Sequence, residues 1–341
     1  MLLPEPRGPL TQALVDALRR PDLSLLPAVS GLRMPADPIG DDDLQLALWI
    51  CFELHYRGFD DVAETMEWAP PVIAVRRALE EQLLAALRRE SFVPPSQAPV
   101  AERLRALVDG DDGPSVARFV QTKATLAQFT EFAAQRSVYQ LKEADPHTWA
   151  VPRLSGRAKA ALVEIQIDEY GRGDETRMHY ELYRGLLRGL GLSDAYGAYV
   201  DAVPGITLAI SNVMSMFGLR RDLRGALVGH LAAYEMTSSA PCRRYAKGLR
   251  RLGGDDEMCR FYDEHVTADA LHEQLAAHDL CGGLAEAEPQ LIEDIVFGAA
   301  ACLHVDNRFA EHVLGAWQRG RSSLRKPDAV GASALLAAVG V

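Results

Sequence analysis

The chain has 341 residues, of which 48% are hydrophobic and 24% are charged, so its composition is that of an ordinary globular protein with a sizeable core. A formal net charge of −11 argues against nucleic acid or an anionic membrane as a partner, because both require basic patches. The five cysteines have no C-x-x-C spacing, no run of about 18 apolar residues occurs, and the N-terminus lacks a signal-peptide pattern, so we expect a cytoplasmic protein with reduced thiols.

Apolar residues recur at helical spacing along most of the chain, and few β-branched residues alternate with polar ones. A first helix is predicted to begin near Leu44. Further helices are predicted at 72–89, 99–108, 114–143, 155–170, 175–190, 193–201, 204–217, 220–236, 240–251, 256–278, 287–304 and 306–318. Ser155 and Ser193 are suitable N-caps, and Gly191 and Gly253 stand where helices should end. The expected fold class is therefore all-α.

Two stretches of the sequence have the composition of linkers. Residues 91–100 (SFVPPSQAPV) are rich in Pro and Ser, and residues 109–114 (DGDDGP) are acidic and contain glycine. They suggest an N-terminal helical portion at 1–113 and a helical core at 114–325. The Ala- and Gly-rich tail at 326–341 is expected to be loosely ordered.

The sharpest local motif lies in the predicted helix at 256–278. His265, Asp269 and His272 are spaced i, i+4 and i+7, so at about 100° per residue their side chains fall within roughly 60° of arc on one helix face. Two imidazoles and a carboxylate on one face are suitable ligands for iron, manganese or zinc. By itself this pattern fits a metal site and a merely polar helix face equally well.

Glu235 lies in a predicted helix whose neighbouring residues are mostly apolar, GALVGHLAAYEMTSSAP. A carboxylate among such neighbours is costly to bury unless it is paired or bound to a metal. The alternative is an exposed glutamate near the end of the helix. His230 lies five residues earlier, near the opposite side of the same helix, and we interpret it as structural.

Glu169 and His179 are ten residues apart, which puts them about 80° out of phase on an ideal helix. Gly171 and Gly173 lie between them. We therefore expect the helix to be broken there, or to unwind locally as in a π-bulge, so that both side chains reach one centre. Other acidic residues of the same stretch compete as candidates: Glu164, Asp168 and Glu181.

The order and spacing of these residues resemble those of a known family. The segments YQLKEADPHTWAVPRL, EIQIDEYGRGDETRMHYELY and FYDEHVTADALHE are similar to the ligand-bearing helices of the haem-oxygenase-like di-iron oxidases, in particular their N-oxygenating branch. The resemblance spans roughly residues 115–325 and includes a later helix, FGAAACLHVDNRFAEHVLGAWQRGRSSLR. It gives Glu143 a role, since without it a glutamate just before Pro146 would be interpreted as a solvated charge at a helix end.

The resemblance implies a helical bundle of the haem-oxygenase type that holds two iron ions. The implied ligands are Glu143, Glu169, His179, Glu235, His265, Asp269 and His272. One iron would be held by His179 and Glu143 with a shared Glu169. The other would use His265 or His272 together with Glu235 and Asp269. The helices before the core resemble a dimerisation region, so a homodimer is expected.

The implied reaction is N-oxygenation with O2 as co-substrate and an external electron donor. Two ferrous ions can together deliver two electrons to O2, after which one oxygen atom passes to an amine or guanidine-like nitrogen of a small molecule. The expected substrates resemble 2-aminoimidazole or an arginine derivative, and the products are N-hydroxy, nitroso or nitro compounds. Some members continue into a C-terminal cupin that forms an N–N bond, whereas this sequence ends at residue 341, so N-oxygenation alone is expected.

Other functions stay open at the level of sequence. Related di-iron oxidases attack C–H bonds and desaturate or fragment aliphatic amino or fatty acids. A metal-free helical binding protein would use the same polar residues as satisfied core groups, and haem is disfavoured because carboxylates cluster where haem needs an apolar slot. Arg308, in a predicted core helix, could pair with a substrate carboxylate or form a structural salt bridge.

Overall fold

The computed structural model describes residues 1–20, 22–27, 31 and 35–330, and at 267–271 it describes the backbone alone. Within these ranges the chain forms helices and turns without a strand, which confirms the all-α fold class. None of the helices found there is long and apolar enough to cross a membrane. The N-terminal helices are α1 (Pro9–Arg19), α2 (Asp42–Glu53) and α3 (Pro70–Glu90), with short 3₁₀ turns at Leu23–Leu25 and Glu64–Trp68.

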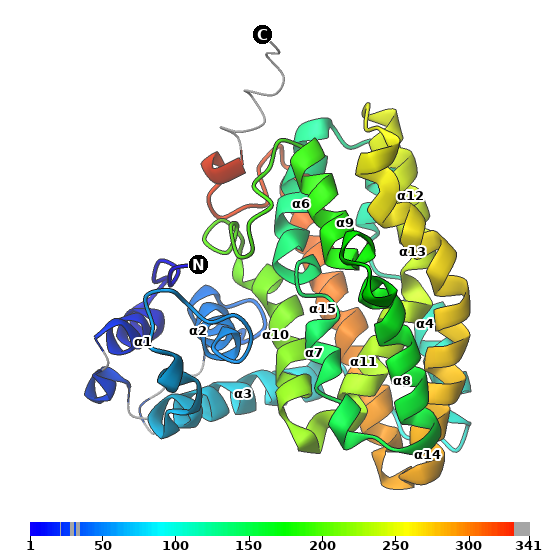
Figure 1. The fold of residues 1–341 in the computed structure, drawn as a ribbon, viewed down its shortest axis with the longest axis horizontal. Coiled ribbons are helices and arrows are strands. Elements are labelled where there is room, and N and C mark those ends of the chain that lie inside the picture. The colour runs from blue at the N-terminus through cyan, green and yellow to red at the C-terminus, as the bar shows by residue number, and fades with distance from the viewer. Residues whose placement is uncertain (21, 28–30, 32–34, 331–341) are drawn as a thin grey trace.

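The remaining helices form a bundle (Figure 1). They are α4 (Val100–Asp109), α5 (Val116–Thr122), α6 (Leu126–Gln140), α7 (Asp145–Thr148), α8 (Gly156–Glu169), α9 (His179–Gly189), α10 (Gly205–Leu219), α11 (Arg224–Thr237), α12 (Ser239–Arg251), α13 (Asp256–Gln274), the π-helical η8 (Leu275–Gly282), α14 (Gly283–Ala287) and α15 (Ile292–Gln318). Short 3₁₀ turns lie at Val151–Arg153, Gly171–Gly173, Glu175–Arg177, Arg221–Leu223 and Pro289–Leu291.

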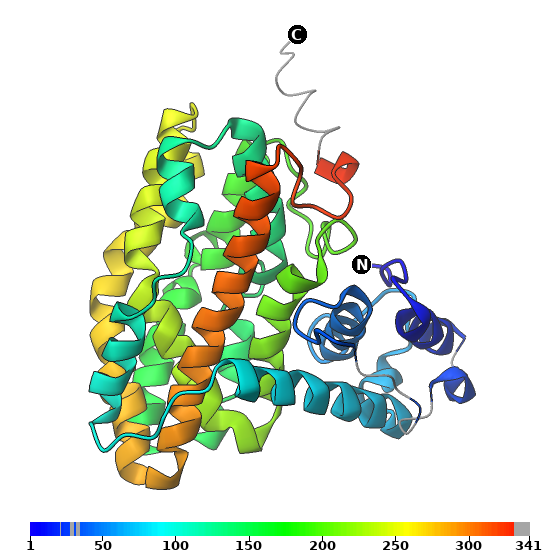
Figure 2. The ribbon, with the colours of Figure 1, turned by 180° about the vertical axis from the view of Figure 1, so that it is seen from behind.

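The N-terminal helices lie to one side of the bundle, and α3 leads from them toward it (Figures 1 and 2). Helix α2 packs on α10 and α3 packs on α15. Helix α4 packs against α11, α15 and η8, so the structure places it with the core helices. Helix α4 thus contacts the core helices although it belongs to the predicted N-terminal portion, and the division at residue 113 stays a prediction.

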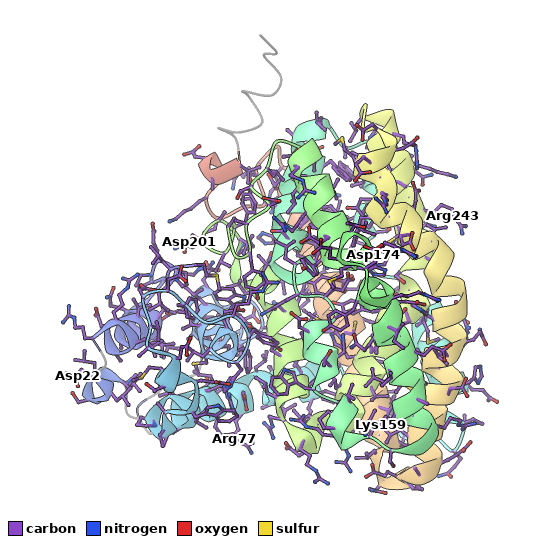
Figure 3. All side chains as sticks on the ribbon, viewed as in Figure 1. Asp22, Arg77, Lys159, Asp174, Asp201 and Arg243 are labelled. Carbon is purple, nitrogen blue, oxygen red and sulfur yellow. The ribbon has the colours of Figure 1, made fainter. Side chains whose placement is uncertain are left out.

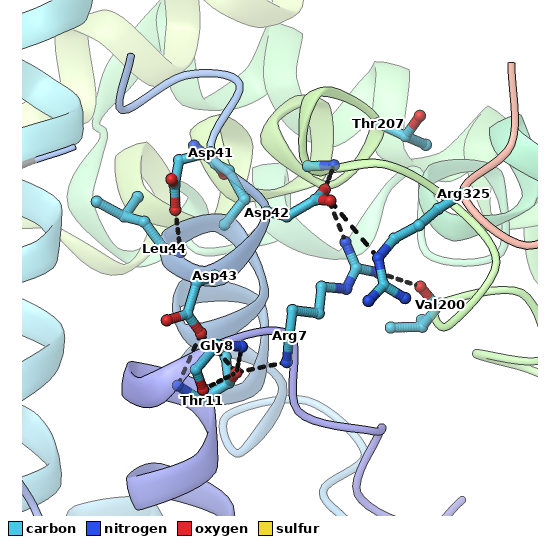
Figure 4. Close-up of polar contacts among 12 residues, drawn as sticks. Arg7, Gly8, Thr11, Asp41, Asp42, Asp43, Leu44, Val200, Thr207 and Arg325 are labelled. Atoms are coloured by element: carbon cyan, nitrogen blue, oxygen red, sulfur yellow. Dashed lines mark hydrogen bonds and ion pairs between the residues drawn. The ribbon is translucent and has the colours of Figure 1, made fainter. Parts of the chain in front are cut away.

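Hydrogen bonds tie the N-terminal portion to the bundle (Figure 4). The Asp41 carboxylate caps α2 by accepting from the backbone N–H of Leu44 at 2.8 Å. The Arg7 guanidinium donates to the Asp42 carboxylate at 3.3 Å and to the carbonyl oxygen of Val200 at 2.5 Å. Since Val200 lies between α9 and α10, these contacts fix the first residues of the chain against the core.

The centre of the bundle is the crossing of α11 and α15, where the two backbones approach closely. A Cβ atom added at Gly229 would overlap the carbonyl of Ile295, and one added at Gly298 would overlap the carbonyl of Ala226. Only glycine fits at these two positions. The close approach buries α11, including Glu235 near its C-terminal end.

Two predicted helices differ from the structure because of local capping. The predicted helix at 114–143 is divided into α5 and α6, because Thr125 begins a new helix with a capping box in which Gln128 is the reciprocal partner. The predicted helix at 193–201 is a series of turns, in which the backbone N–H of Ser193 donates to the Tyr199 hydroxyl at 2.7 Å instead of opening a helix.

Other helix boundaries also differ from those predicted. The predicted helices at 287–304 and 306–318 form the single helix α15, which begins only after Pro289–Leu291. The predicted helix at 256–278 is α13, which ends at Gln274, followed by the π-helical η8, which contains His278. Helix α1 was not predicted. Of the predicted tail, residues 331–341 lie outside the described part of the chain.

Candidate metal centre

The break predicted between Glu169 and His179 is present. Gly171, Arg172 and Gly173 all have positive φ angles, of 63°, 56° and 84°, so the chain leaves α8 in a left-handed turn. Glu169 ends α8 and His179 begins α9, and their Oε2 and Nδ1 atoms lie 3.0 Å apart. Of the two predicted alternatives the broken helix is therefore confirmed at this position, while the π-helical stretch follows α13 at Leu275–Gly282.

The structure brings six of the seven predicted ligands into two groups of three. Glu143, His179 and His265 form one group, and Glu169, Glu235 and His272 form the other. In each group one potential ligand atom per residue lies within 4.8 Å of the others. Asp269 is part of α13, but its side chain lies outside the described residues.

The first group draws on three separate segments. Glu143 follows the end of α6, and its Oε1 accepts a hydrogen bond of 2.7 Å from the Tyr139 hydroxyl. His265 Nδ1–H donates to the carbonyl oxygen of Phe261 at 2.8 Å, which leaves Nε2 to face Glu143 Oε1 at 3.7 Å. The ring of His179 lies 4.4 Å from the ring of His265, between centroids. Each histidine thus presents a nitrogen to the same small volume.

The second group is centred on His272. Its Nδ1 lies 3.3 Å from Glu235 Oε2, and its Nε2 lies 3.0 Å from Asp168 Oδ2. Glu235 is buried on α11, as its apolar neighbours predicted, rather than exposed at a helix end. Asp168, one of the competing carboxylates of α8, contacts the group without belonging to it.

Several buried atoms of these groups lack the partner that a metal ion would supply. His179 Nδ1, Glu169 Oε2 and His272 Nδ1 face oppositely charged groups at 3.0 to 3.3 Å, but none of the three atoms makes a well-aligned hydrogen bond among the described residues. Buried polar atoms without a well-formed hydrogen bond are costly. Carboxylate oxygens and imidazole nitrogens together suit iron, so the donor set fits such an ion.

The electrostatics of the groups also favour a cation. Burial alone would raise the pKa of Glu169, but the neighbouring His179, His265 and His272 lower it to about 2. Burial alone would lower the pKa of His272, but Glu235, Asp168 and Glu169 raise it to about 9. Against the effect of burial, neighbouring carboxylates also raise the pKa of His179. The site therefore attracts positive charge at His179 and His272, and a bound cation would compete with these protons.

A cavity of about 560 Å³ opens onto the two groups. Glu143, Glu169, Glu235 and His265 contribute to its wall. Its other residues include aromatic rings and the partly buried Arg136–Asp306 ion pair, whose NH1–Oδ1 distance is 2.9 Å. The aromatic residues are Phe132, Tyr139, Tyr183, Tyr234, Tyr245, Phe261, Tyr262 and Phe309. Such a cavity can hold a small organic substrate next to the cluster.

The structure also shows the roles of Arg308 and His230, for which the sequence suggested interpretations. Arg308 does not line the cavity, and its guanidinium donates to Asp37 at 2.9 Å and to Glu90 at 3.4 Å. The structural salt bridge is therefore the alternative that the structure shows. His230 is buried in α11, with its Nδ1 3.4 Å from His147 Nε2, in agreement with the structural role.

The contacts that Tyr139 and Asp168 make with the two groups were not predicted from the sequence. Tyr139 lies four residues before Glu143, and a helical i, i+4 spacing could have suggested the contact. Asp168 lies beside Glu169 in sequence, and only the position of α13 shows that it reaches His272.

Comparison with known proteins agrees with this arrangement. Residues 130–307, more than half of the chain, match the model of the haem-oxygenase-like family described as iron-containing redox enzymes. The chain belongs to this family and is an iron-dependent redox enzyme.

Among characterised proteins it is similar to nitrosourea synthase of Streptomyces achromogenes subsp. streptozoticus, with 28% identity over 268 residues. The match covers 73% of this chain and 56% of the relative, so the chain spans little more than half the length of that protein.

Proposed function

We propose that this protein is a non-haem di-iron N-oxygenase. The proposed ligands of the two iron ions are Glu143, Glu169, His179, Glu235, His265, Asp269 and His272. The observation that carries the proposal is the meeting of two carboxylate–histidine groups, each with ligand atoms within 4.8 Å of one another, at the wall of one cavity. Membership of an iron-containing family supports the choice of metal.

When bound, two ferrous ions would supply the two electrons needed to activate O2. The residues of the chain hold the ions with ionised carboxylates and exclude bulk water through the aromatic wall of the cavity. An external electron donor would return the ions to the ferrous state. Tyr139, hydrogen-bonded to Glu143, fixes the orientation of that carboxylate beside the substrate cavity.

The proposed substrate is a small molecule with an amine or guanidine-like nitrogen, such as 2-aminoimidazole or an arginine derivative. The product would be an N-hydroxy, nitroso or nitro compound. The name of the similar enzyme, nitrosourea synthase, supports oxidation at nitrogen, because a nitrosourea carries an N–O group. We further propose that the enzyme acts in the cytoplasm as a homodimer formed through residues 1–113.

The proposal can be tested by loading the protein anaerobically with ferrous iron, measuring iron per chain, and exposing it to ¹⁸O2 with a reductant and a panel of amines and guanidines. Mass spectrometry should show ¹⁸O attached to the substrate nitrogen. His272→Ala should bind less iron and form no product.

Two results would contradict the proposal. Loss of CO2 or a carbon fragment, or desaturation without N–O formation, would assign the enzyme to C–H attack. Equal iron content in wild type and His272→Ala would contradict the metal centre itself.

A further inference from the structure

The two ring nitrogens of His272 have different surroundings. Nδ1 faces Glu235 Oε2 at 3.3 Å and lacks a hydrogen-bond partner among the described residues. Nε2 lies 3.0 Å from Asp168 Oδ2, within hydrogen-bond distance. The imidazole is almost fully buried, so water cannot replace either contact. The ring is therefore held between one carboxylate of the cluster and one carboxylate outside it.

Asp168 points in a different direction from its neighbour Glu169. Consecutive residues of a helix point about 100° apart, and Asp168 meets the ring nitrogen of His272 that faces away from Glu235. It belongs to neither group of potential ligands, and it does not line the cavity. Its role must be exerted through His272.

Asp168 is itself held by Arg172. The Arg172 Nε donates to Asp168 Oδ1 at 2.7 Å, while the Arg172 side chain remains 66% exposed. Arg172 has a φ of 56° and is the only non-glycine residue with a positive φ in the described ranges. A left-handed backbone is unfavourable for arginine, so the flanking turn imposes this conformation. The turn that separates Glu169 from His179 thus also places the guanidinium over Asp168.

We propose that Asp168 is a positioning residue of the metal centre: it accepts the Nε2–H of His272, is oriented by Arg172, and so presents the His272 Nδ1 to the metal. This inference rests on the proposed function. Metal-bound histidines commonly donate their second ring N–H to a carboxylate, which fixes the tautomer and strengthens the ligand. Here the exposed Arg172 contacts Asp168, and Asp168 contacts His272 of the buried cluster.

The test compares Asp168→Ala, Asp168→Asn and Arg172→Ala with wild type in anaerobic titrations with Fe²⁺ and with Co²⁺. The absorption spectrum of the Co²⁺-loaded protein reports the ligands directly, which a purely structural contribution would not change. Asp168→Ala should weaken binding of one of the two ions about 10- to 100-fold and alter the Co²⁺ spectrum. Asp168→Asn should have a smaller effect, because the amide oxygen still accepts the N–H, and Arg172→Ala should have the smallest.

The matched control is Asp174→Ala. Asp174 lies in the same connection between α8 and α9, is exposed on the bundle surface (Figure 3), and accepts hydrogen bonds only within its own turn, from Thr176. Its replacement should leave affinity and spectrum unchanged. Thermal unfolding of each metal-free variant verifies that the fold is retained, and Asp168→Asn provides a variant of nearly unchanged shape.

Three results would overturn the inference, and only the third is also a failure of the proposed function. If wild type binds two ions and Asp168→Ala does so with the same affinity and spectrum, Asp168 does not position His272. If Asp168→Asn loses an ion as completely as His272→Ala, Asp168 is a ligand. If wild type binds no metal, the inference falls together with the proposed function.

Discussion

At the scale of single residues, proposed ligands of the cluster are oriented by hydrogen bonds to neighbouring groups. The carbonyl oxygen of Phe261 orients the His265 ring by accepting a hydrogen bond from its Nδ1–H, and the Tyr139 hydroxyl orients Glu143 by donating to its carboxylate. Both contacts are made by the chain's own groups. They restrict the orientation of the two side chains, which lowers the entropic cost of ordering them when a metal binds.

Removal of a single carboxylate should show which side chains hold metal. Glu235→Gln keeps the size of the side chain but removes its charge, so we expect metal affinity to fall by at least about tenfold. Glu164→Gln, a change on α8 outside both groups, is the control and should bind as wild type does. Elemental analysis and calorimetric titration measure the difference. Equal losses in both variants would show that the effect is not specific to the cluster.

A second residue-scale prediction concerns the buried pair His147 and His230. Burial lowers the pKa of His147 to about 4 and that of His230 well below its ordinary value. Unfolded histidines take up protons near pH 6.5, so the unfolded state binds more protons than the folded state below that pH. The stabilisation is complete above about pH 6.5 and is lost as the pH falls toward 4.

Urea unfolding of metal-free protein between pH 7.5 and pH 5 should show this loss. Each histidine adds a slope of at most about 1.4 kcal/mol per pH unit to the free energy of unfolding. His230→Gln should reduce the slope, because one titrating group is removed. A variant with the wild-type slope would mean that the pair does not govern the acid sensitivity.

The ligand set could be only partly predicted from sequence. The i, i+7 spacing places His265 and His272 on one face of α13, and the apolar neighbours of Glu235 predict its burial. Glu143 lies beyond the end of its helix, where neither spacing nor burial can be predicted, so only the resemblance indicated it. Asp168 and Glu169 could not be distinguished, because their difference arises from how α13 packs against α8.

At the scale of secondary-structure elements, the crossing of α11 and α15 is the tightest constraint. Gly229→Ala would push a methyl group into the carbonyl of Ile295, and backbone atoms cannot rotate away. We expect a loss of about 1–3 kcal/mol or more in the free energy of unfolding. Denaturant titration measures this change.

Gly185→Ala in α9 is the matched control. A Cβ there would meet Glu257 at an ordinary 3.6 Å. Since alanine favours a helix over glycine by about 1 kcal/mol, this control should be neutral or stabilising. If both substitutions have equal effects, the close crossing is not the cause.

The helices were predicted well where apolar residues recur at helical spacing and a proline or glycine marks the end of the helix. Helix α3 begins at Pro70, where proline suits a first turn, and α12 is followed by Gly253 with a φ of 94°. The break before Thr125 was missed because a capping box consists of residues that are also tolerated inside helices. The predicted break between 304 and 306 is absent from α15, where Asp306 pairs with Arg136 from α6 and the helix continues past it.

At the scale of the whole molecule, a buried ion pair links the N-terminal helices to the candidate centre. Lys142 Nζ lies 3.1 Å from Glu53 Oε2, and the Tyr196 hydroxyl donates to the same oxygen at 2.8 Å. Both charged side chains are almost wholly buried. Lys142 directly precedes Glu143, so α2 helps to place one of the proposed ligands.

Lys142→Met should therefore destabilise the protein strongly. The change leaves the Glu53 carboxylate buried without its cation, at a cost of about 3–5 kcal/mol. Thermal and urea unfolding measure the effect. Arg77→Ala, which breaks an exposed pair on α3 (Figure 3), should change stability by less than about 1 kcal/mol. Similar small effects of both changes would argue against a linking role for the buried pair.

The left-handed turn at 171–173 also bears on the order in which the molecule folds. Helices form from contacts near in sequence, whereas Glu143 and His265, whose Oε1 and Nε2 atoms lie 3.7 Å apart, are separated by more than a hundred residues of sequence. Such distant contacts close late, after α8, α9, α11 and α13 have docked. Because the turn brings α8 and α9 together by local geometry, one of the three residues of each group, Glu169 or His179, reaches its position early. Iron should therefore enter a finished fold and need not act as its template.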